Sequence, residues 1–242
     1  MKTICLWSGP RNVSTALMYS FAQRADTRVV DEPLYGHYLR VSDAEHPGRN
    51  EVMASMNCDG DAVMAELLRR PADGPVSMQF LKQMAHHLVD IDRKFLHDTE
   101  NILLIRDPGA MLQSLTIQLP HAVLADSGLA IQWQLYLELV ENGQRPAIID
   151  SRELLLDPAG ILARLCQHLD IEFDTAMSSW PPGRRTEDGV WEKYWYQAVH
   201  KSTGFAPYEP KPPCPEALRN LLYECQPFYD LLFNHALRAQ RR

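Results

Sequence analysis

The sequence predicts a three-layer α/β protein, with helices on both faces of a mostly parallel, doubly wound sheet of about five strands. Two patterns and the composition lead to this fold class. Short apolar runs recur along the chain, and segments of helical length lie between them. Such alternation is typical of βαβ units, which build parallel sheets. Of the 242 residues, 45% are hydrophobic and 23% are charged, which is sufficient for one sizeable core.

Five apolar runs are the expected strands, at residues 3–7, 28–30, 76–81, 101–105 and 147–149. We expect helices over 14–24, 61–70, 129–140 and 159–169, and a further helix that begins at Asp107 and Pro108. Asp is a favoured N-cap and Pro suits the first helical position, so this pair marks a helix start. Residues 129–140 are apolar nearly all round, which predicts a helix packed between layers.

The composition changes after Ser178, where prolines become frequent. We interpret 178–242 as an irregular C-terminal cap on a single domain, 1–242, with helices near 215–225 and 228–238. The aromatic residues Trp191, Tyr194 and Trp195 lie in this cap. We expect them to pack in a core beneath it, with stacking on an adenine or the lining of an acceptor pocket as alternatives.

The net charge of −7 excludes a global basic field for nucleic acid or an anionic membrane surface. No apolar run reaches the roughly 18 residues of a membrane span, and the first residues do not resemble a signal peptide. The five cysteines are odd in number and widely spaced, so we expect reduced thiols, a cytoplasmic protein and no metal site. The sequence does not indicate whether the protein is a monomer or an oligomer.

The strongest local feature is the connection from the first strand to the first helix. A tight turn that opens into a helix directs free backbone N–H groups and the positive helix end toward one point, which favours an anion. Arg11 adds a charged fork for phosphate or sulfate oxygens, although a turn with a surface arginine is the alternative. No Walker A lysine is present. The candidate anion-binding residues are Ser8, Gly9, Pro10, Arg11, Asn12, Val13, Ser14 and Thr15.

A second feature is Arg106 at the end of the fourth strand, with Ser114 eight residues later. Ligands of parallel sheets bind outside the carboxyl ends of the strands. We therefore expect Arg106 and Ser114 to lie on the same edge as the first loop and to hold a second phosphate. The alternative is an arginine paired with an acid at a strand-to-helix junction.

Four segments together resemble the sulfotransferases of the P-loop superfamily, which use 3′-phosphoadenosine 5′-phosphosulfate. In chain order these segments are WSGPRNVSTALM, ILLIRDPGAMLQS, PAIIDSRELLLDPAGILARLCQHLDIEF and HKSTGF. The resemblance covers about residues 3–205 and implies a P-loop NTPase-like fold. It also implies that 9–15 wrap the 5′-phosphosulfate and that Arg106 and Ser114 bind the 3′-phosphate. Lys201, Ser202 and Gly204 would complete the nucleotide site.

Transfer of a sulfuryl group to an alcohol or amine of a small molecule requires a general base. Glu32 ends the second strand, where some members of the family place a glutamate, and His86 follows the third strand, where others use a histidine. Lys82 is expected to protonate or neutralise the bridging oxygen, with a solvated surface side chain as the alternative. Glu32, Arg11, Lys82 and His86 are therefore the candidate catalytic residues, with Glu32 favoured as the base.

Two other functions are compatible with the sequence. Cys5 and Arg11 fit the C-x5-R spacing of cysteine-dependent phosphatases, in which a thiolate attacks phosphorus. A nucleotide-binding module without catalysis is the third hypothesis.

For the sulfotransferase hypothesis, the pocket that binds the acceptor is expected to be built from 36–70, the cap and 119–128.

Overall fold

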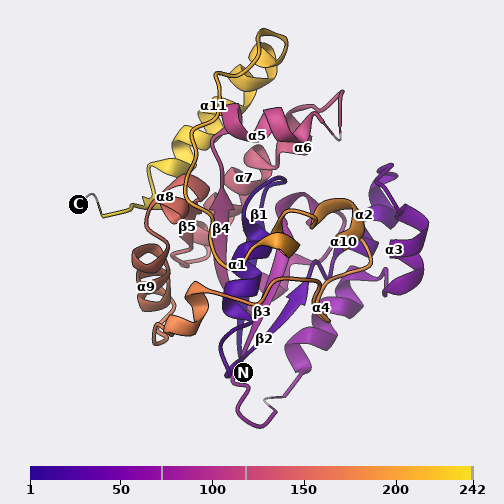
Figure 1. Cartoon of the computed structure of the whole chain (residues 1–242). Helices are drawn as coiled ribbons and strands as arrows, with labels where there is room; N and C mark the ends of the chain where they lie inside the picture. The colour runs from indigo at the N-terminus through magenta and orange to yellow at the C-terminus, as the bar shows by residue number, and fades with distance from the viewer. Residues whose placement is uncertain (72, 118, 241–242) are drawn as a thin grey trace.

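A single parallel sheet organises the chain, as the computed structural model in Figure 1 shows. The structure describes residues 1–71, 73–117 and 119–240. Its strand order is β2-β3-β1-β4-β5-β6, and each neighbouring pair is parallel. The fold class predicted from the sequence is confirmed. The strands are β1 (Lys2–Ser8), β2 (Thr27–Asp31), β3 (Met78–Met84), β4 (Glu100–Ile105), β5 (Ala147–Asp150) and β6 (Ala236–Leu237).

Helices pack on both faces of this sheet. The α-helices are α1 (Ser14–Phe21), α2 (Tyr35–Ser42), α3 (Arg49–Ser55), α4 (Gly60–Arg69), α5 (Pro108–Leu115), α6 (Leu124–Ser127), α7 (Leu129–Glu141), α8 (Ser151–Leu156), α9 (Pro158–His168), α10 (Glu192–Trp195) and α11 (Arg219–Phe233). Shorter 3₁₀ turns are η1 (Ala85–His87), η2 (Arg93–Asp98), η3 (Thr175–Ser178), η4 (Val199–Lys201) and η5 (Glu216–Leu218).

Two cores lie on opposite faces of the sheet because successive strand side chains point to opposite sides. In β1, Ile4 and Leu6 join the core under α1 and α9, whereas Cys5 and Trp7 join the core under α5, α7 and α11. A third, smaller cluster joins α2 and α3 to the α10 segment, which lies beside α2 in Figure 1. This contact brings the C-terminal cap close to the carboxyl end of β2.

Two expectations about the elements were wrong. Residues 215–225 and 228–238 do not form two helices: α11 runs through Pro227, because its buried Tyr229 and Leu232 anchor the second half despite the lost backbone hydrogen bond. Helix α7 is not packed between layers, since Leu137 is 41% exposed. The sheet also has a sixth strand, β6, which is too short to give a recognisable pattern.

The strand order creates a switch point between β1 and β4. The connection after β1 leads toward β2 at one edge of the sheet, and the connection after β4 leads toward β5 on the other side. Loops that diverge in this way leave a crevice at the carboxyl ends of the strands, where α/β proteins bind ligands. Both predicted anion-binding segments begin here, because residue 9 follows β1 and residue 106 follows β4.

Candidate active site

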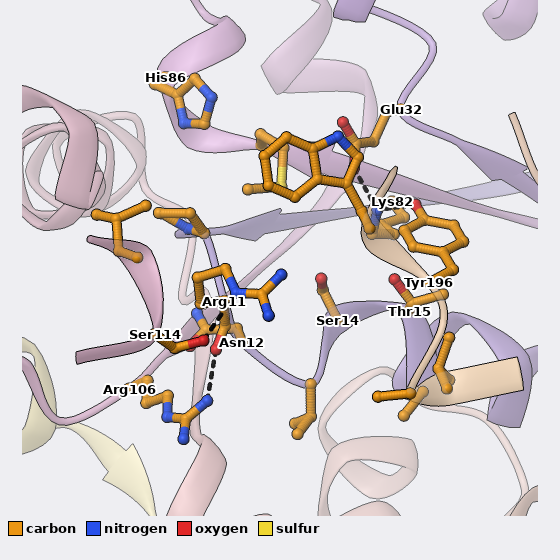
Figure 2. A pocket seen from close by; sticks show the side chains of 18 of the residues that line it. Arg11, Asn12, Ser14, Thr15, Glu32, Lys82, His86, Arg106, Ser114 and Tyr196 are labelled. Atoms are coloured by element: carbon orange, nitrogen blue, oxygen red, sulfur yellow. Dashed lines mark hydrogen bonds and ion pairs between the residues drawn. The ribbon is translucent and has the colours of Figure 1, made fainter. Parts of the chain in front are cut away.

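A cavity of about 510 Å³ lies at the carboxyl ends of the central strands. Its lining includes the loop after β1, the end of β2 and residues that follow β3 and β4. In Figure 2, Arg11, Arg106 and Ser114 lie on one side, Glu32, Lys82 and Tyr196 lie on the other with Thr15 beside them, and Ser14 lies between the two groups. The cavity is therefore built by segments far apart in the sequence.

Two arginines meet at the first side of this cavity. Arg11 Nε donates a hydrogen bond to Ser114 Oγ (2.9 Å), and Arg106 Nη1 donates to the carbonyl oxygen of Arg11. Burial lowers the pKa of both guanidinium groups, and the Arg11 charge lowers that of Arg106 further. Within the described residues, neither arginine has a carboxylate within salt-bridge distance. Two half-buried arginines so close together repel each other, which favours the binding of an anion between them.

The first turn of α1 adds backbone donors to the same region. Its N-cap residue, Val13, provides no side-chain cap, and the first backbone hydrogen bond of the helix runs from Leu17 N to Val13 O (3.0 Å). In the described part of the chain, the N–H groups of Ser14, Thr15 and Ala16 have no acceptor, and these residues line the cavity. Helix N-termini with free N–H groups attract anions.

Three residues of the first loop hold its shape, and only one of them, Asn12, also lines the cavity. Asn12 donates to Leu104 O (2.9 Å) and to Ser8 Oγ (3.2 Å), which fastens the loop to the end of β4. Ser8 in turn donates to Gly9 O (2.7 Å). Gly9 packs so closely that an added Cβ would lie 2.8 Å from Ser127 O. Ser8 and Gly9 do not line the main cavity, in contrast to Pro10, Arg11, Asn12, Val13, Ser14 and Thr15.

The late basic loop is only partly in place. Ser202 and Gly204 line the cavity, but Lys201 is exposed and does not. Ser202 Oγ already donates to Val199 O (2.7 Å) and accepts from Trp180 Nε1 (3.1 Å). The geometry therefore gives Ser202 a role in holding this loop, and it does not bring Lys201 to the cavity.

A buried charged cluster forms the opposite side. Lys82 Nζ donates to Asp31 Oδ1 (2.9 Å), to Glu32 Oε1 and to Tyr196 Oη (2.7 Å). Its side chain is 1% exposed. Burial alone would lower the pKa of Lys82, but the two carboxylates raise it. Because all three N–H groups are engaged, Lys82 has none left for the bridging oxygen that the sequence assigned to it.

Glu32 lies where this cluster meets the cavity. Its backbone has φ +42°, an uncommon conformation for a residue other than glycine, and Arg11 shares it with φ +54°. Burial raises the pKa of the Glu32 carboxyl, Lys82 opposes the rise and Asp31 adds to it. A carboxyl group with a raised pKa accepts a proton more readily near neutral pH.

His86 also lines the cavity, in the aromatic wall formed by η1 and α2. Its ring contacts those of Tyr38 and His87 at centroid distances of 5.0 and 4.7 Å, and Tyr35 stacks on His87. Burial lowers the pKa of His86 to about 3, with a smaller contribution from His46. A neutral imidazole with so low a pKa is a weak base, so the geometry and the pKa directions favour Glu32.

The aromatic residues of the cap divide between the two roles considered for them. Trp191 is buried in the third core cluster, as expected, and Tyr194 is 38% exposed. Trp195 lines the cavity and lies 6.4 Å from the ring of His46. The cap therefore contributes one of these three side chains to the cavity wall.

Cys5 is not placed to act as a nucleophile. It is fully buried in the middle of β1, and burial raises the pKa of its thiol to about 12. Cysteine phosphatases need a thiolate, so the alternative based on Cys5 and Arg11 is wrong. The five cysteines are all unpaired. Among the described residues, no group of three or more metal-ligating side chains could hold a metal ion, and no helix is long and apolar enough to cross a bilayer.

Sequence reasoning missed Asp31 and Tyr35, and it named only the segments, 36–70 and the cap, that contribute Tyr38, His46 and Tyr196 to the cavity. Asp31 and Tyr196 complete the Lys82 cluster, and Tyr35, Tyr38 and His46 line the aromatic wall. One signal was available for Asp31, which precedes Glu32 at the end of a strand. The others lie in segments without a regular pattern.

These features match a known family. A profile described as "Sulfotransferase domain" matches residues 1–236. The chain belongs to the sulfotransferase domain family.

Two curated proteins of Arabidopsis thaliana are similar in sequence. Branched-chain-amino-acid aminotransferase-like protein 2 is 37% identical over 237 residues, which cover 97% of this chain and 42% of that protein. Branched-chain-amino-acid aminotransferase-like protein 1 is 37% identical over 231 residues, which cover 95% of this chain and 41% of that protein. The chain thus spans about two fifths of the length of these relatives.

Two solved structures share the fold. A sulfotransferase domain from the curacin biosynthetic pathway has a TM-score of 0.53 at 15% identity, covering 96% of this chain and 97% of that chain. A sulfotransferase from Alicyclobacillus acidocaldarius has a TM-score of 0.56 at 12% identity, covering 98% and 97%. At these identities the similarity concerns the fold alone.

Proposed function

We propose that this sulfotransferase moves the sulfuryl group of 3′-phosphoadenosine 5′-phosphosulfate to a hydroxyl or amine group of a small molecule. The observation that carries the proposal is the pair of arginines at one cavity. Arg11 and Arg106 follow different strands, β1 and β4, are half-buried and have no carboxylate within salt-bridge distance among the described residues. A donor with phosphate groups at both ends of its ribose supplies the missing negative charge.

Each end of the donor has a matching group of residues in this proposal. The N–H groups of Ser14 and Thr15, together with Arg11, hold the 5′-phosphosulfate. Arg106 and Ser114 hold the 3′-phosphate, and Ser202 and Gly204 lie along the nucleotide. Pro10, Asn12 and Val13 belong to the same loop as Arg11 and also line the cavity. Ser8 and Gly9 support its shape from below, and Lys201 stays at the surface.

Catalysis then needs a base beside the acceptor. Glu32 takes the proton of the attacking hydroxyl or amine while the new S–O or S–N bond forms. The bond from sulfur to the bridging oxygen breaks, and adenosine 3′,5′-bisphosphate leaves. Arg11 balances the charge that develops on the transferred group. Lys82 positions Glu32 and does not touch the bridging oxygen, because its three N–H groups are engaged.

The acceptor end of the cavity offers no unpaired cation among the described lining residues. Burial lowers the pKa values of His46 and His86, so both imidazoles are neutral at pH 7. Lys82 is the one lysine among the described lining residues, and the two carboxylates that it contacts outweigh its charge. Asp126, close to His46 and Tyr38, adds a further acidic side chain. These surroundings favour a neutral small molecule over an anionic one.

We also propose that the chain forms one domain and that it acts in the cytoplasm. Fractionation of cells that contain the native protein would test the second of these proposals.

The names of the plant relatives suggest a second chemistry, aminotransfer. That chemistry uses a lysine that forms a Schiff base with pyridoxal phosphate and so must lose its proton. Lys82 has a raised pKa and three hydrogen-bonded partners. The described cavity therefore supports sulfuryl transfer better, and the aminotransferase name belongs to relatives that are more than twice as long.

Calorimetry with adenosine 3′,5′-bisphosphate tests the nucleotide site. We expect the wild-type protein to bind it and Arg106→Ala to bind at least about tenfold more weakly, because charge-assisted hydrogen bonds are lost. The matched control is Arg93→Ala, which removes a half-buried arginine that pairs with Glu138 and does not line the cavity. Absence of binding, or equal binding by both variants, would overturn the assignment.

A screen with labelled donor would then identify the acceptor. Neutral alcohols, phenols and amines should accept the label, whereas carboxylated analogues of the same size should not. Transfer to the carboxylated analogues alone would contradict the preference for neutral acceptors that we infer from the lack of an unpaired cation at this end of the described cavity.

A further inference from the structure

Tyr196 occupies a position in the Lys82 cluster that no motif indicates. Its hydroxyl group donates to the Asp31 carboxylate, at 2.9 Å from Oδ1 and 2.8 Å from Oδ2. The same oxygen accepts from Lys82 Nζ (2.7 Å) and from Trp191 Nε1 (3.2 Å). The residue is 4% exposed and comes from the C-terminal cap, 165 positions from Asp31. Figure 2 shows it beside Lys82.

We propose that Tyr196 is a positioning residue that shares out the charge of Lys82 between Asp31 and Glu32, and so holds Glu32 ready to accept a proton. This inference rests on the proposed function, in which Glu32 is the base. Tyr196 does not touch the reacting atoms in this role. It acts through the cluster, and it makes the base depend on the cap.

The physical reasoning begins with the charge of the cluster. One ammonium group and two carboxylates leave a net negative charge in a buried place, so one carboxyl group binds a proton readily. Asp31 accepts hydrogen bonds from Tyr196 and Lys82, and from Gly189 N at 3.3 Å. Glu32 has Lys82 as its ion-pair partner. Among the described residues, Asp31 thus has more hydrogen-bond donors than Glu32, so we assign the proton exchange to Glu32.

Removal of the Tyr196 hydroxyl group changes this balance. Asp31 loses a donor, so it draws Lys82 more strongly and leaves Glu32 less stabilised as an anion. The pKa of Glu32 then rises further, in agreement with the lowering effect that Tyr196 has on it. The other titratable groups close to the cluster are Tyr35 on α2, beside Glu32, and His87 on η1, beside Lys82. Both are neutral near pH 7, because burial raises the pKa of Tyr35 and lowers that of His87.

Tyr196→Phe is the decisive variant because it keeps the buried ring. We expect carbon-13 NMR titration of the Glu32 side-chain carboxyl, identified by its loss in Glu32→Gln, to show a pKa at least about half a unit above wild type. The acid limb of the pH–rate profile should move upward by the same amount, with unchanged affinity for adenosine 3′,5′-bisphosphate.

The matched control is Tyr19→Phe. Tyr19 also donates to a buried aspartate, Asp188 (2.7 and 2.9 Å), but does not line the cavity. It should lose similar stability and leave the Glu32 titration unchanged. Trp191→Phe, which removes the donor to Tyr196, should give a smaller shift in the same direction and serves if Tyr196→Phe does not fold.

The titration does not depend on turnover, so it separates the two ideas. If the Glu32 pKa is higher in Tyr196→Phe than in wild type, and the wild-type protein transfers no sulfuryl group, the result would support the role of Tyr196 and contradict the proposed reaction. Equal titration curves for wild type and Tyr196→Phe, or for Trp191→Phe where it replaces that variant, would show that Tyr196 is structural only.

Discussion

At the residue scale, Glu32 and His86 are the two candidates for one role, and their surroundings shift them in opposite directions. Burial raises the pKa of Glu32 and lowers that of His86 to about 3. We therefore expect Glu32→Gln to lower the rate of sulfuryl transfer at least about 100-fold, with nucleotide binding intact. Gln keeps an acceptor for Lys82, so the cluster should stay folded. The transfer rate as a function of pH is the measurement.

The matched variant at the other position is His86→Asn. It should change the rate much less and should keep the acid limb, in which activity rises with pH as the Glu32 carboxyl loses its proton. Glu32→Gln should abolish that limb. Near-normal turnover of Glu32→Gln, together with a large loss in His86→Asn, would assign the base to His86.

The same scale shows why the cluster was only partly predictable. Glu32 and Lys82 were recognisable because each ends or follows an apolar strand. Their contact was not, since it depends on the parallel register that places Asp31 opposite Lys82. Register between strands 50 positions apart follows from packing of the two sheet faces, and one strand's sequence does not contain it. Tyr196 was harder still, because it lies in an irregular segment.

At the element scale, the first loop depends on a backbone contact with the turn between α6 and α7. Gly128 has φ +73°, and an added Cβ would lie 3.3 Å from Gly9 Cα. We expect Gly128→Ala to lower the free energy of unfolding by about 1 to 2 kcal/mol, because of its left-handed backbone. It should also weaken nucleotide binding several-fold by displacing the loop. Denaturation and calorimetry measure the two effects.

Gly143 offers the control for this prediction. Its φ of +78° carries the same conformational cost, but an added Cβ would meet no atom within 4 Å. Gly143→Ala should therefore lose similar stability and bind nucleotide normally. Equal binding by both alanine variants would mean that the contact between Gly128 and Gly9 does not shape the nucleotide loop.

Elements with a strong local signal were predictable, and the others were not. The strands at the sheet centre are continuous apolar runs, and Asp107 caps α5 through a bond from Ala110 N (3.0 Å), as the Asp-Pro pair indicated. Helices α2 and α3 were missed. Their stability comes from packing against Trp191 and Tyr196 in the cap, which is a long-range effect.

At the scale of the whole molecule, the pH dependence of stability should carry a contribution from Asp150. This residue is fully buried at the end of β5, where it caps α8 and accepts from Tyr229 Oη on α11 (3.1 Å). Burial raises the pKa of its carboxyl to about 6, from an ordinary value of 3.8. It therefore joins the sheet to helices on both faces while carrying a charge that the fold disfavours.

The sign of this effect follows from proton binding. Between pH 4 and 6 the folded state holds the Asp150 proton more tightly than the unfolded chain does. The stability that this proton confers is present below about pH 4 and is lost as the pH rises through 6. The loss amounts to as much as about 3 kcal/mol, since one pKa unit corresponds to about 1.4 kcal/mol.

Asp150→Asn isolates this contribution, because Asn is an equally good helix cap and does not titrate. We expect the free energy of unfolding of the variant, relative to wild type, to increase as the pH rises from 4 to 7. Urea denaturation at several pH values measures it. The other buried groups, including Glu32 and His86, titrate in both proteins and cancel in the difference. A difference that stays constant over this range would mean that Asp150 is ionised in the folded protein already at pH 4, and that Tyr229 and the α8 amides stabilise its charge more than burial destabilises it.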